Sequence, residues 1–234
     1  MNNQIVQVER SENKYYLRYD LVSELKKELQ KILELDEYSS KGSYIVRSLY
    51  FDTINNNDFN EKMAGVQNRK KIRLRVYSPN SKNAKFEIKA KQGAFQKKSS
   101  LIVSREVAEQ IMQGNYGILL NHSENLIALK LYSMLTLGCY RPVVLIEYDR
   151  IAYTYPENDI RITIDTKVRS SEIELDLFNT EVPFIGTIQE QAIVEVKFNG
   201  KLLESLAKIF SKYPMVQTSI SKYGTGRPIM QKYI

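Results

Sequence analysis

The sequence predicts an α+β protein in which antiparallel β-strands outnumber the helices. Charged and apolar residues alternate along segments spread over the whole chain, and this period of two is typical of strands with one polar face. Apolar residues recur at helical spacing in only a few segments. The 234 residues contain no internal repeat, low-complexity tract or proline- and glycine-rich linker, so we expect one domain spanning residues 1–234.

The clearest alternation lies in two neighbouring segments, residues 71–77 and 85–91. In the first, Lys71, Arg73 and Arg75 alternate with apolar residues, and the second repeats the pattern with lysines. Turn-forming residues between the segments suit a hairpin, so the two strands would place cations side by side on one face. The same alternation predicts further strands at residues 10–14, 43–53, 147–152, 160–165 and 194–198.

Helices are expected in four places. Asp20 can cap a helix that runs to about Leu35, and Ser123 can cap a second helix that is apolar nearly all round. Another short helix is predicted over Glu106–Gln113, and the last begins near Asn199. The glycine-containing stretch Tyr223–Gly226 lacks the strand–loop–helix context of a phosphate loop, so we expect a flexible turn there.

Basic residues are concentrated in one part of the chain. The formal net charge is 34 − 27 = +7. Between Arg69 and Arg105 there are 12 basic residues and one acidic residue, Glu87. The rest of the chain therefore carries 34 − 12 = 22 basic and 27 − 1 = 26 acidic residues, a net of −4. Such a local excess indicates either a solvated basic face or a polyanionic partner, such as nucleic acid, anionic lipid or a phosphate chain.

Residue types that carry common catalytic and metal chemistry are rare. The single cysteine, Cys139, excludes an internal disulfide and a cysteine metal cage, and the single histidine, His122, excludes a site with two histidine ligands. Apolar runs are too short for a membrane span, and the first residues lack the apolar stretch of a secretory signal. We therefore expect a soluble, cytoplasmic protein without a transmembrane segment of its own.

Charged faces on so many strands are compatible with two architectures. The sheet can close on itself, with the apolar side packed against helices outside and the charged side around a cationic, water-filled interior. Alternatively, a sandwich or open sheet can expose its charged side to solvent. Burial of many like charges in a closed sheet is costly unless an anion fills the space. The period of the pattern leaves both architectures open.

Eight short stretches follow one another in an order that resembles a known family. They are Arg10–Tyr15, Tyr50–Thr53, Arg73–Tyr77, Phe86–Lys89, Glu147–Tyr153, Arg161–Asp165, Val194–Lys197 and Ser221–Tyr223. Together they resemble the VTC domain, the polyphosphate polymerase branch of the triphosphate tunnel metalloenzymes, which form the CYTH superfamily. The resemblance covers nearly the whole chain, from residue 8 to about residue 226.

This resemblance implies a fold and an activity. The fold would be a closed antiparallel β-barrel, a triphosphate tunnel with basic residues inside and helices packed on the outside. The activity would be that of a metal-dependent phosphotransferase, which transfers the γ-phosphate of ATP to a growing inorganic polyphosphate chain. Mn²⁺ or Mg²⁺ would be the cofactor, and the ligands would be ATP and polyphosphate or pyrophosphate, not nucleic acid. A membrane-protein partner is left open.

The resemblance also implies roles for individual residues. The catalytic, phosphate-binding set is Lys14, Arg73, Arg75, Lys89, Arg150, Arg161 and Lys222. Further substrate contacts are expected from Lys91, Lys98, Tyr148, Lys197 and Ser221. Lys97 is an alternative to its neighbour Lys98, and Glu195 would hold the metal ion.

Other acidic residues have structural interpretations. We expect Glu12 and Glu87 to form ion pairs that separate the cations, and the alternative role of either residue is to help Glu195 hold the metal ion. Asp165 is expected to pair with Arg161 or Lys167.

One departure from the superfamily pattern bears on the activity. The triphosphatase and cyclase branches begin with a Glu-x-Glu-x-Lys strand, whereas Arg10 stands at the first of these positions here. This substitution favours the polymerase branch. Two alternatives are an inorganic or nucleoside triphosphatase of the same fold and a non-catalytic module that binds polyphosphate or another polyanion.

Overall fold

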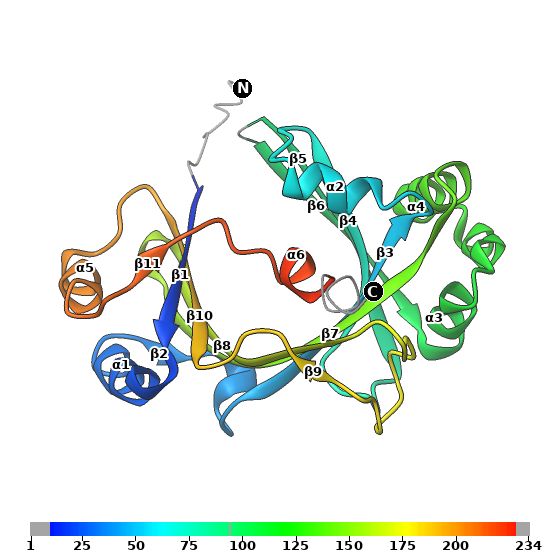
Figure 1. Ribbon diagram of the computed structural model, residues 1–234. Coiled ribbons are helices and arrows are strands. Elements are labelled where there is room, and N and C mark those ends of the chain that lie inside the picture. Colours follow the sequence, from blue (N-terminus) through cyan, green and yellow to red (C-terminus); the bar gives the residue numbers. More distant parts are fainter. Residues whose placement is uncertain (1–9, 94, 228–234) are drawn as a thin grey trace. The chain divides into compact units, whose positions relative to one another are not determined.

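The computed structural model describes residues 10–93 and 95–227, and the chain divides into two compact units (Figure 1). Unit 1 comprises the described residues up to Tyr44, together with Tyr148–Lys167 and Ile188–Ile220. Unit 2 comprises Ile45–Glu147, Val168–Thr187 and the described residues from Ser221 onwards. Each unit is therefore assembled from segments that lie far apart in the sequence.

In the described residues, eleven strands form one sheet, in the order β11-β1-β10-β8-β7-β3-β4-β5-β6, with β2 beside β7 and β9 beside β8. The strands are β1 (Arg10–Arg18), β2 (Glu34–Leu35), β3 (Tyr44–Thr53), β4 (Arg69–Val76), β5 (Asn83–Gln92), β6 (Phe95–Ser104), β7 (Tyr140–Tyr155), β8 (Ile160–Ser171), β9 (Ile185–Gly186), β10 (Gln191–Asn199) and β11 (Val216–Gln217). Neighbouring strands pair antiparallel, as in β1–β10, β10–β8, β3–β4, β4–β5 and β5–β6. The predicted α+β class with a large antiparallel sheet is confirmed.

Six α-helices accompany the sheet within residues 10–93 and 95–227. They are α1 (Val22–Leu29), α2 (Asn57–Met63), α3 (Arg105–Met112), α4 (Leu126–Leu137), α5 (Glu204–Phe210) and α6 (Lys222–Gly226). Short 3-10 helices lie at Tyr19–Leu21, Glu37–Ser39, Tyr116–His122 and Glu157–Asp159. Within the described part of the chain, no helix combines the length and the apolar character that crossing a bilayer requires.

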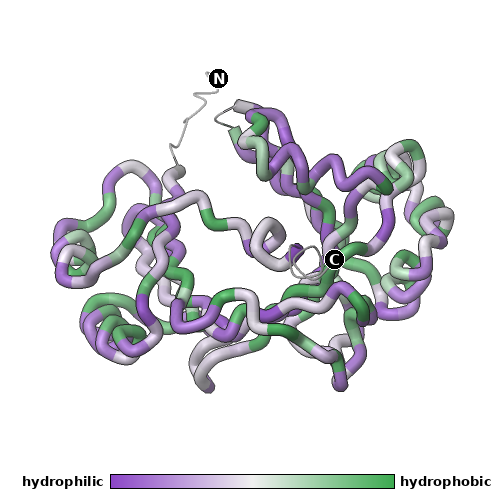
Figure 2. The backbone as a smooth tube through the Cα atoms, in the orientation of Figure 1, coloured by the Kyte–Doolittle hydropathy of each residue, from purple (hydrophilic) through white to green (hydrophobic). Residues whose placement is uncertain are grey.

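Unit 2 has its hydrophobic core on one face of β3–β6. Leu49, Leu74, Phe86 and Leu101 lie opposite one another across these four strands, and all are buried. The helices α3 and α4 pack their apolar residues into the same core and lie on one side of the strands (Figure 1). Hydrophilic and hydrophobic residues follow one another along the strands (Figure 2). The polar residues of β4 and β5 therefore share the opposite face of the sheet.

Unit 1 repeats this arrangement with different strands. Val194 of β10 lies opposite Tyr15 of β1 on one side and Ile164 of β8 on the other. Apolar residues of α1 and α5 join the buried cluster of these strands, and both helices lie beside β1 and β10 in Figure 1. The charged residues of β1, β8 and β10 alternate with the apolar residues of this cluster and so occupy the face that α1 and α5 do not cover.

The ends of three predicted helices differ from the sequence-based expectation. A 3-10 turn precedes α1, and α1 ends at Leu29 rather than near Leu35. The cap of α4 is Asn125, whose side-chain oxygen accepts the N–H of Ile127, instead of Ser123. The last predicted helix, α5, begins at Glu204, later than expected. These ends are set by local capping and turn geometry, which apolar spacing specifies weakly.

Asp52 organises a helix that apolar spacing did not indicate. Its carboxylate accepts the backbone N–H groups of Asp58 and Phe59, each at 3.0 Å, and thereby binds the first turn of α2. The hydroxyl of Tyr223 in α6 donates to the same carboxylate. A short buried helix thus stands where a flexible turn was expected, because Tyr223 fixes α6 to the end of β3.

The strand order starts at β11 and ends at β6, so within the described residues the hydrogen-bonded path is open. This strand pairing shows a large antiparallel sheet. Among the described strands it contains no pairing between the first and last strands of the path, so it does not show the expected closed barrel.

Candidate functional site

The charged face of unit 2 carries a group of polar side chains that we call the β4 cluster. It consists of Tyr50, Lys71, Arg73, Arg75, Glu87, Lys89 and Lys98, from β3, β4, β5 and β6. Residues that lie directly opposite one another in an antiparallel sheet project to the same face. The register of these strands therefore determines which members of the cluster are neighbours.

Three lysines form one row of the β4 cluster. Lys71 lies opposite Lys89, and Lys89 lies opposite Lys98. Like charges directly opposite each other in a sheet are destabilising, and a bound polyanion relieves the repulsion. Nζ of Lys71 also lies 2.7 Å from the hydroxyl oxygen of Ser221, which brings α6 to this row.

The next row contains the best-buried charges of the cluster. Tyr50, Arg73 and Glu87 lie opposite one another on β3, β4 and β5. Nε and Nη2 of Arg73 lie 2.8 and 2.7 Å from Oε2 of Glu87, and Lys98 contacts the other carboxylate oxygen. Glu87 is thus an ion-pair partner between cations, as expected.

Electrostatics keep Glu87 ionised. Burial alone would raise its pKa, but the charges of Arg73 and Arg75 and the hydrogen bonds from Lys98 and Arg73 outweigh burial and lower the pKa to about 2. Arg75 itself is held by the hydroxyl of Ser48, 3.0 Å from its Nε. Both arginines are therefore fixed on the sheet, each only 8% exposed.

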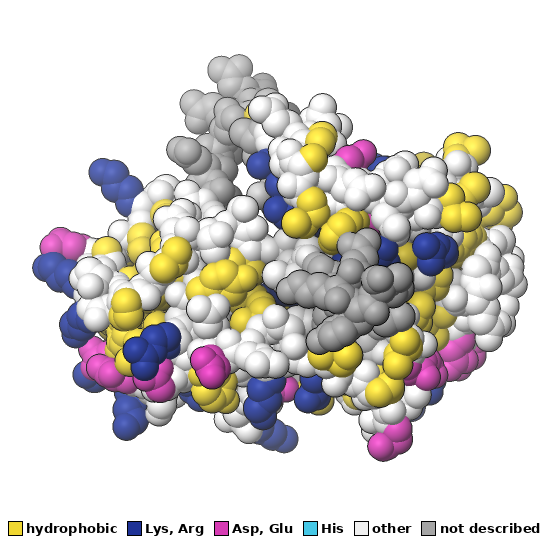
Figure 3. Space-filling view, in the orientation of Figure 1, with side chains coloured by type: hydrophobic (Ala, Val, Ile, Leu, Met, Phe, Trp, Pro, Cys, Tyr) yellow, Lys and Arg dark blue, Asp and Glu magenta, His cyan; other side chains and the backbone are white. Residues whose placement is uncertain are grey.

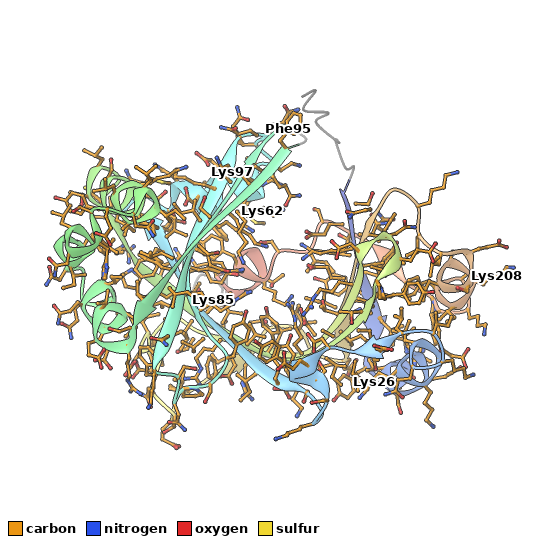
Figure 4. The ribbon with its side chains drawn as sticks, turned by 180° about the vertical axis from the view of Figure 1, so that it is seen from behind. Lys26, Lys62, Lys85, Phe95, Lys97 and Lys208 are labelled. Atoms are coloured by element: carbon orange, nitrogen blue, oxygen red, sulfur yellow. The ribbon has the colours of Figure 1, made fainter. Side chains whose placement is uncertain are left out.

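The structure distinguishes Lys98 from its neighbour Lys97. Lys98 shares the face of Lys89 and contacts Glu87. Lys97 lies opposite Ala90, at the alternate position of the strand, and its side chain belongs to the other face of the hairpin. Figure 4 shows Lys97 near the end of the hairpin, with Phe95 at its tip. Of the two alternatives, Lys98 is the member of the β4 cluster.

α6 contributes hydroxyl groups from the C-terminal part of unit 2. The side chain of Ser221 accepts the N–H of Gly224 and caps the helix, while its oxygen also contacts Lys71. The ring of Tyr223 stacks on that of Tyr50, with centroids 5.0 Å apart, and Lys71 lies over the Tyr223 ring. Lys222 is the first residue of this helix.

Unit 1 carries a second charged group, which we call the β10 cluster. It consists of Glu12, Lys14, Tyr148, Arg150, Arg161, Asp165, Glu195 and Lys197, from β1, β7, β8 and β10. Lys14 lies opposite Glu195, and Glu12 lies opposite Lys197, so opposite charges face each other in the register. Acidic and basic groups are therefore closer to balance here than in the β4 cluster.

Lys14 is the centre of the β10 cluster. Its Nζ lies 2.7 Å from Oε1 of Glu12 and 3.4 Å from Oε2 of Glu195. Burial lowers the pKa of Lys14, but the two carboxylates outweigh burial and raise it. Nζ of Lys197 lies 2.6 Å from Oε1 of Glu195. Glu12 is an ion-pair partner, as expected.

A two-point ion pair fixes Arg150. Nε and Nη2 of Arg150 lie 2.6 and 2.7 Å from the two carboxylate oxygens of Asp165, and the guanidinium carbon lies 5.2 Å from the centre of the Tyr148 ring. Burial disfavours the charge, but Asp165 outweighs it and raises the pKa of Arg150. The observed partner of Asp165 is thus Arg150, whereas the two partners expected for it pair with other carboxylates, Arg161 with Asp36 at 2.7 Å and Lys167 with Asp149 at 3.1 Å.

The β10 cluster also offers oxygen ligands for a divalent cation. Glu12 and Glu195 converge on the ammonium of Lys14, a single positively charged point. Hard cations prefer carboxylate oxygens, and Mg²⁺ keeps several waters when only one or two carboxylates bind it. The donor set fits such an ion. Among the described residues, no group of three or more His, Cys, Asp or Glu side chains gathers, so water and phosphate oxygens would have to complete the coordination.

The structure divides the predicted site residues between the units. Unit 2 holds Arg73, Arg75, Lys89, Lys91, Lys98, Ser221 and Lys222. Unit 1 holds Lys14, Tyr148, Arg150, Arg161, Glu195 and Lys197. Sequence reasoning did not assign Tyr50 or Lys71 to the site. Lys71 lies two residues before Arg73 on the same strand, so the alternation alone could have placed it on the same face. The position of Tyr50 beside Arg73 depends on strand register.

The surface shows where basic groups remain accessible. Lys98 is 49% exposed although it contacts the buried Glu87. Lys and Arg side chains are visible on the part of unit 2 formed by the β5–β6 hairpin and α2 (Figure 3). A polyanion could therefore reach the β4 cluster through its lysines, while the arginines below them remain ordered.

Comparison with known proteins identifies related sequences and folds. A family model described as the VTC domain matches residues 9–231. A candidate adenylate cyclase from Bacillus halodurans is 13% identical, with a TM-score of 0.51 over 90% of this chain and 92% of that chain. A candidate adenylate cyclase from Vibrio parahaemolyticus is also 13% identical, with a TM-score of 0.46 over 87% and 83%. No curated protein matches the sequence. The first structure shows a shared fold.

Proposed function

The chain belongs to the VTC domain family, and from this premise we propose that it is a polyphosphate polymerase that transfers the γ-phosphate of ATP to a growing inorganic polyphosphate chain. One observation carries the proposal: the register of β4, β5 and β6 places Lys71, Lys89 and Lys98 in one row beside Arg73. Such a row offers successive positive charges to a chain of phosphates. Lysine side chains alone do not select a particular nucleobase.

Positioned cations are what phosphoryl transfer requires of a protein. The acceptor's terminal phosphate oxygen forms a bond to the γ-phosphorus, the bond from that phosphorus to the β–γ bridging oxygen breaks, and ADP leaves with the electron pair. The protein contributes mainly orientation and charge stabilisation. Arg73, Arg75 and Arg150 are each held by a hydrogen bond or ion pair, so their guanidinium groups are ordered before substrate arrives.

The chemistry of the acceptor agrees with the residues present. A terminal phosphate is already ionised near neutral pH, so its attack needs no general base. The absence of a second histidine and a second cysteine from the sequence is then no obstacle. Each charge-assisted hydrogen bond contributes roughly 1.5–3 kcal/mol, so several such contacts can retain a phosphate chain.

The proposal includes a divalent cation, Mn²⁺ or Mg²⁺, held by Glu195 with Glu12 beside it. Such an ion would neutralise negative charge on phosphate oxygens. Lys14 and Lys197 hold the two carboxylates in place through their ion pairs, and for Glu12 the two lysines outweigh burial and the charge of Glu195 and lower the pKa. Tyr148 and Arg161 lie in the same cluster and are proposed as further phosphate contacts.

The proposal also retains the architecture that the family resemblance implies. The sheet would close into a tunnel within one domain spanning residues 1–234, with the charged strand faces toward its interior. The antiparallel sheet and the helices on the apolar faces of both units support this proposal.

Incubation of the purified protein with ATP and Mn²⁺, followed by gel electrophoresis, tests the activity. The proposal predicts a ladder of phosphate chains that requires the metal. Single phosphates without chain growth would indicate a triphosphatase, and tight binding without turnover would indicate a polyanion-binding module. Either result would contradict polymerisation.

A pair of variants tests the role of Glu195. Glu195→Gln is expected to abolish the ladder while the protein remains folded, because the amide loses the negative charge that a cation needs. Glu204→Gln is the matched control, since Glu204 forms an exposed ion pair with Lys208 in the same unit. Full activity of Glu195→Gln would refute the metal role.

A further inference from the structure

Tyr50 lies at the centre of the β4 cluster and has no role in the phosphoryl transfer proposed above. It lies directly opposite Arg73 in the β3–β4 pair, and its hydroxyl oxygen lies 3.0 Å from Nη1 of Arg73. The guanidinium carbon of Arg73 also lies 5.8 Å from the centre of the Tyr50 ring. The side chain is only 6% exposed. Its hydroxyl therefore contacts a cation that is proposed to bind phosphate.

The ring of Tyr50 is fixed by its neighbour in α6. Tyr223 stacks on it at 5.0 Å with an interplanar angle of 17°. The hydroxyl of Tyr223 is committed to Asp52, and burial together with that carboxylate raises the pKa of Tyr223. Of this stacked pair, Tyr223 thus serves the fold, whereas the hydroxyl of Tyr50 faces the arginines.

The charges around the Tyr50 hydroxyl are mostly positive. Strand β4 contributes Lys71, Arg73 and Arg75, whose charges all act on it. The neighbouring acidic groups, Asp52 on β3 and Glu87 on β5, are engaged by Tyr223 and by Arg73. Such surroundings favour a negative charge at the hydroxyl position, whether it comes from the phenol itself or from a bound anion.

We propose that Tyr50 is a phosphate-positioning residue that takes up a proton when phosphate binds to the β4 cluster. Without phosphate, the phenolate oxygen accepts the hydrogen bond from Arg73. When a phosphate oxyanion arrives, the phenolate takes a proton from solvent, and the neutral hydroxyl donates a hydrogen bond to the oxyanion. One proton is gained and no other bond changes. This role rests on the proposed function, because the anion is a phosphate.

The acidity of Tyr50 supports this exchange. Burial alone would raise the pKa, but Arg73, Arg75, Lys71 and the Arg73 hydrogen bond outweigh burial and lower the pKa to about 7. A bound anion partly cancels these charges and moves the pKa back up. Phosphate binding therefore takes up a proton at pH values above about 7 and not below, and affinity falls as the pH rises through that range, by up to about tenfold per pH unit.

A pH titration of the ligand-free protein tests the ionisation of Tyr50. Tyrosinate has its own near-ultraviolet absorbance, and we expect one of the 16 tyrosines to ionise near neutral pH in the wild type. This step should vanish in Tyr50→Phe and persist in Tyr19→Phe, a control at an exposed tyrosine of unit 1. Absence of the step from the wild type would overturn the proposal even if Tyr50→Phe did not fold.

Calorimetry with trimetaphosphate tests the link to phosphate. This cyclic triphosphate has only strongly acidic groups, so it does not itself titrate near neutral pH. From about pH 7 to about pH 9, the wild type should lose affinity more steeply than Tyr50→Phe and should take up a proton on binding. Equal pH slopes in the two proteins, or no binding at any pH, would overturn the role of Tyr50. Intact proton-linked binding without a phosphate ladder would instead overturn only the polymerase assignment.

Discussion

Arg150 and Asp165 form a two-point ion pair in which Nε and Nη2 of the guanidinium lie 2.6 and 2.7 Å from the two carboxylate oxygens. Both side chains are nearly buried, so the pair holds the arginine in one orientation. A lysine cannot reproduce this geometry, because its ammonium is a single point charge on a flexible chain.

The first prediction follows from this geometry. Arg150→Lys is expected to weaken tripolyphosphate binding about tenfold, or about 1.4 kcal/mol, as measured by calorimetry. Arg18→Lys is the control, because Arg18 makes the same two contacts with Asp20 at the surface of unit 1. Equal affinities for both variants and the wild type would show that the orientation of Arg150 does not matter.

Lys98 and Lys97 provide the second prediction. Lys98→Ala should weaken tripolyphosphate binding and reduce its dependence on salt, because it removes a positive charge from the row with Lys71 and Lys89. Lys97→Ala removes the same charge one residue earlier, on the other face of the hairpin, and should change binding little. Equal losses in the two variants would contradict the assignment of Lys98 alone.

The third prediction concerns Asp58 and pH. Both carboxylate oxygens of Asp58 lie 3.0 Å from the hydroxyl of Tyr140, and one lies 3.2 Å from Nζ of Lys70. Burial raises its pKa to about 6, and Lys70 only partly offsets this. The pKa of Asp58 in the folded protein thus exceeds its value in the unfolded chain. Protonation of Asp58 therefore stabilises the folded protein fully below about pH 4, and this contribution is lost as the pH rises through about 6.

Asp58→Asn isolates this effect, since the amide does not titrate. Urea unfolding at about pH 4 and about pH 7 should show the wild type losing about 2–3 kcal/mol relative to Asp58→Asn. A difference between the two proteins that stays constant over this range would mean that Asp58 titrates normally.

The fourth prediction concerns stability in unit 2. Glu147 is 1% exposed and accepts hydrogen bonds from Arg47, at 2.5 Å, and from Arg169. Glu147→Ala leaves Arg47 buried without its counter-charge and should lower the free energy of unfolding by about 3–5 kcal/mol. Glu204→Ala, which breaks an exposed ion pair with Lys208, should leave that free energy nearly unchanged. Similar unfolding curves for both variants would refute the importance of this buried pair.

Much of the fold follows from local patterns in the sequence. The alternation of Lys71, Arg73 and Arg75 with apolar residues predicts β4 because period two specifies which face each residue occupies. The predicted bounds of helix α3 were nearly exact, since Ser104 caps the helix and Gly114 follows its end. Cys139, by contrast, is exposed at a left-handed backbone position, a turn property that its residue type does not signal.

The candidate site depends more on contacts between distant segments. The pairing of Tyr50 with Arg73 and of Asp52 with Tyr223 requires strand register and the placement of α6, which no local pattern encodes. The choice of Arg150 as the partner of Asp165 has the same origin. The family resemblance therefore named the candidate cations, and the partners of these cations became evident only in three dimensions.

The fate of the γ-phosphate of ATP distinguishes polyphosphate synthesis from hydrolysis. With γ-labelled ATP and Mn²⁺, the label can be followed into chains and into orthophosphate while ADP is measured in the same sample. Polyphosphate synthesis predicts that each ADP formed is matched by one labelled phosphate in a chain. Recovery of all the label as orthophosphate, or no ADP at all, would contradict polyphosphate synthesis by this protein.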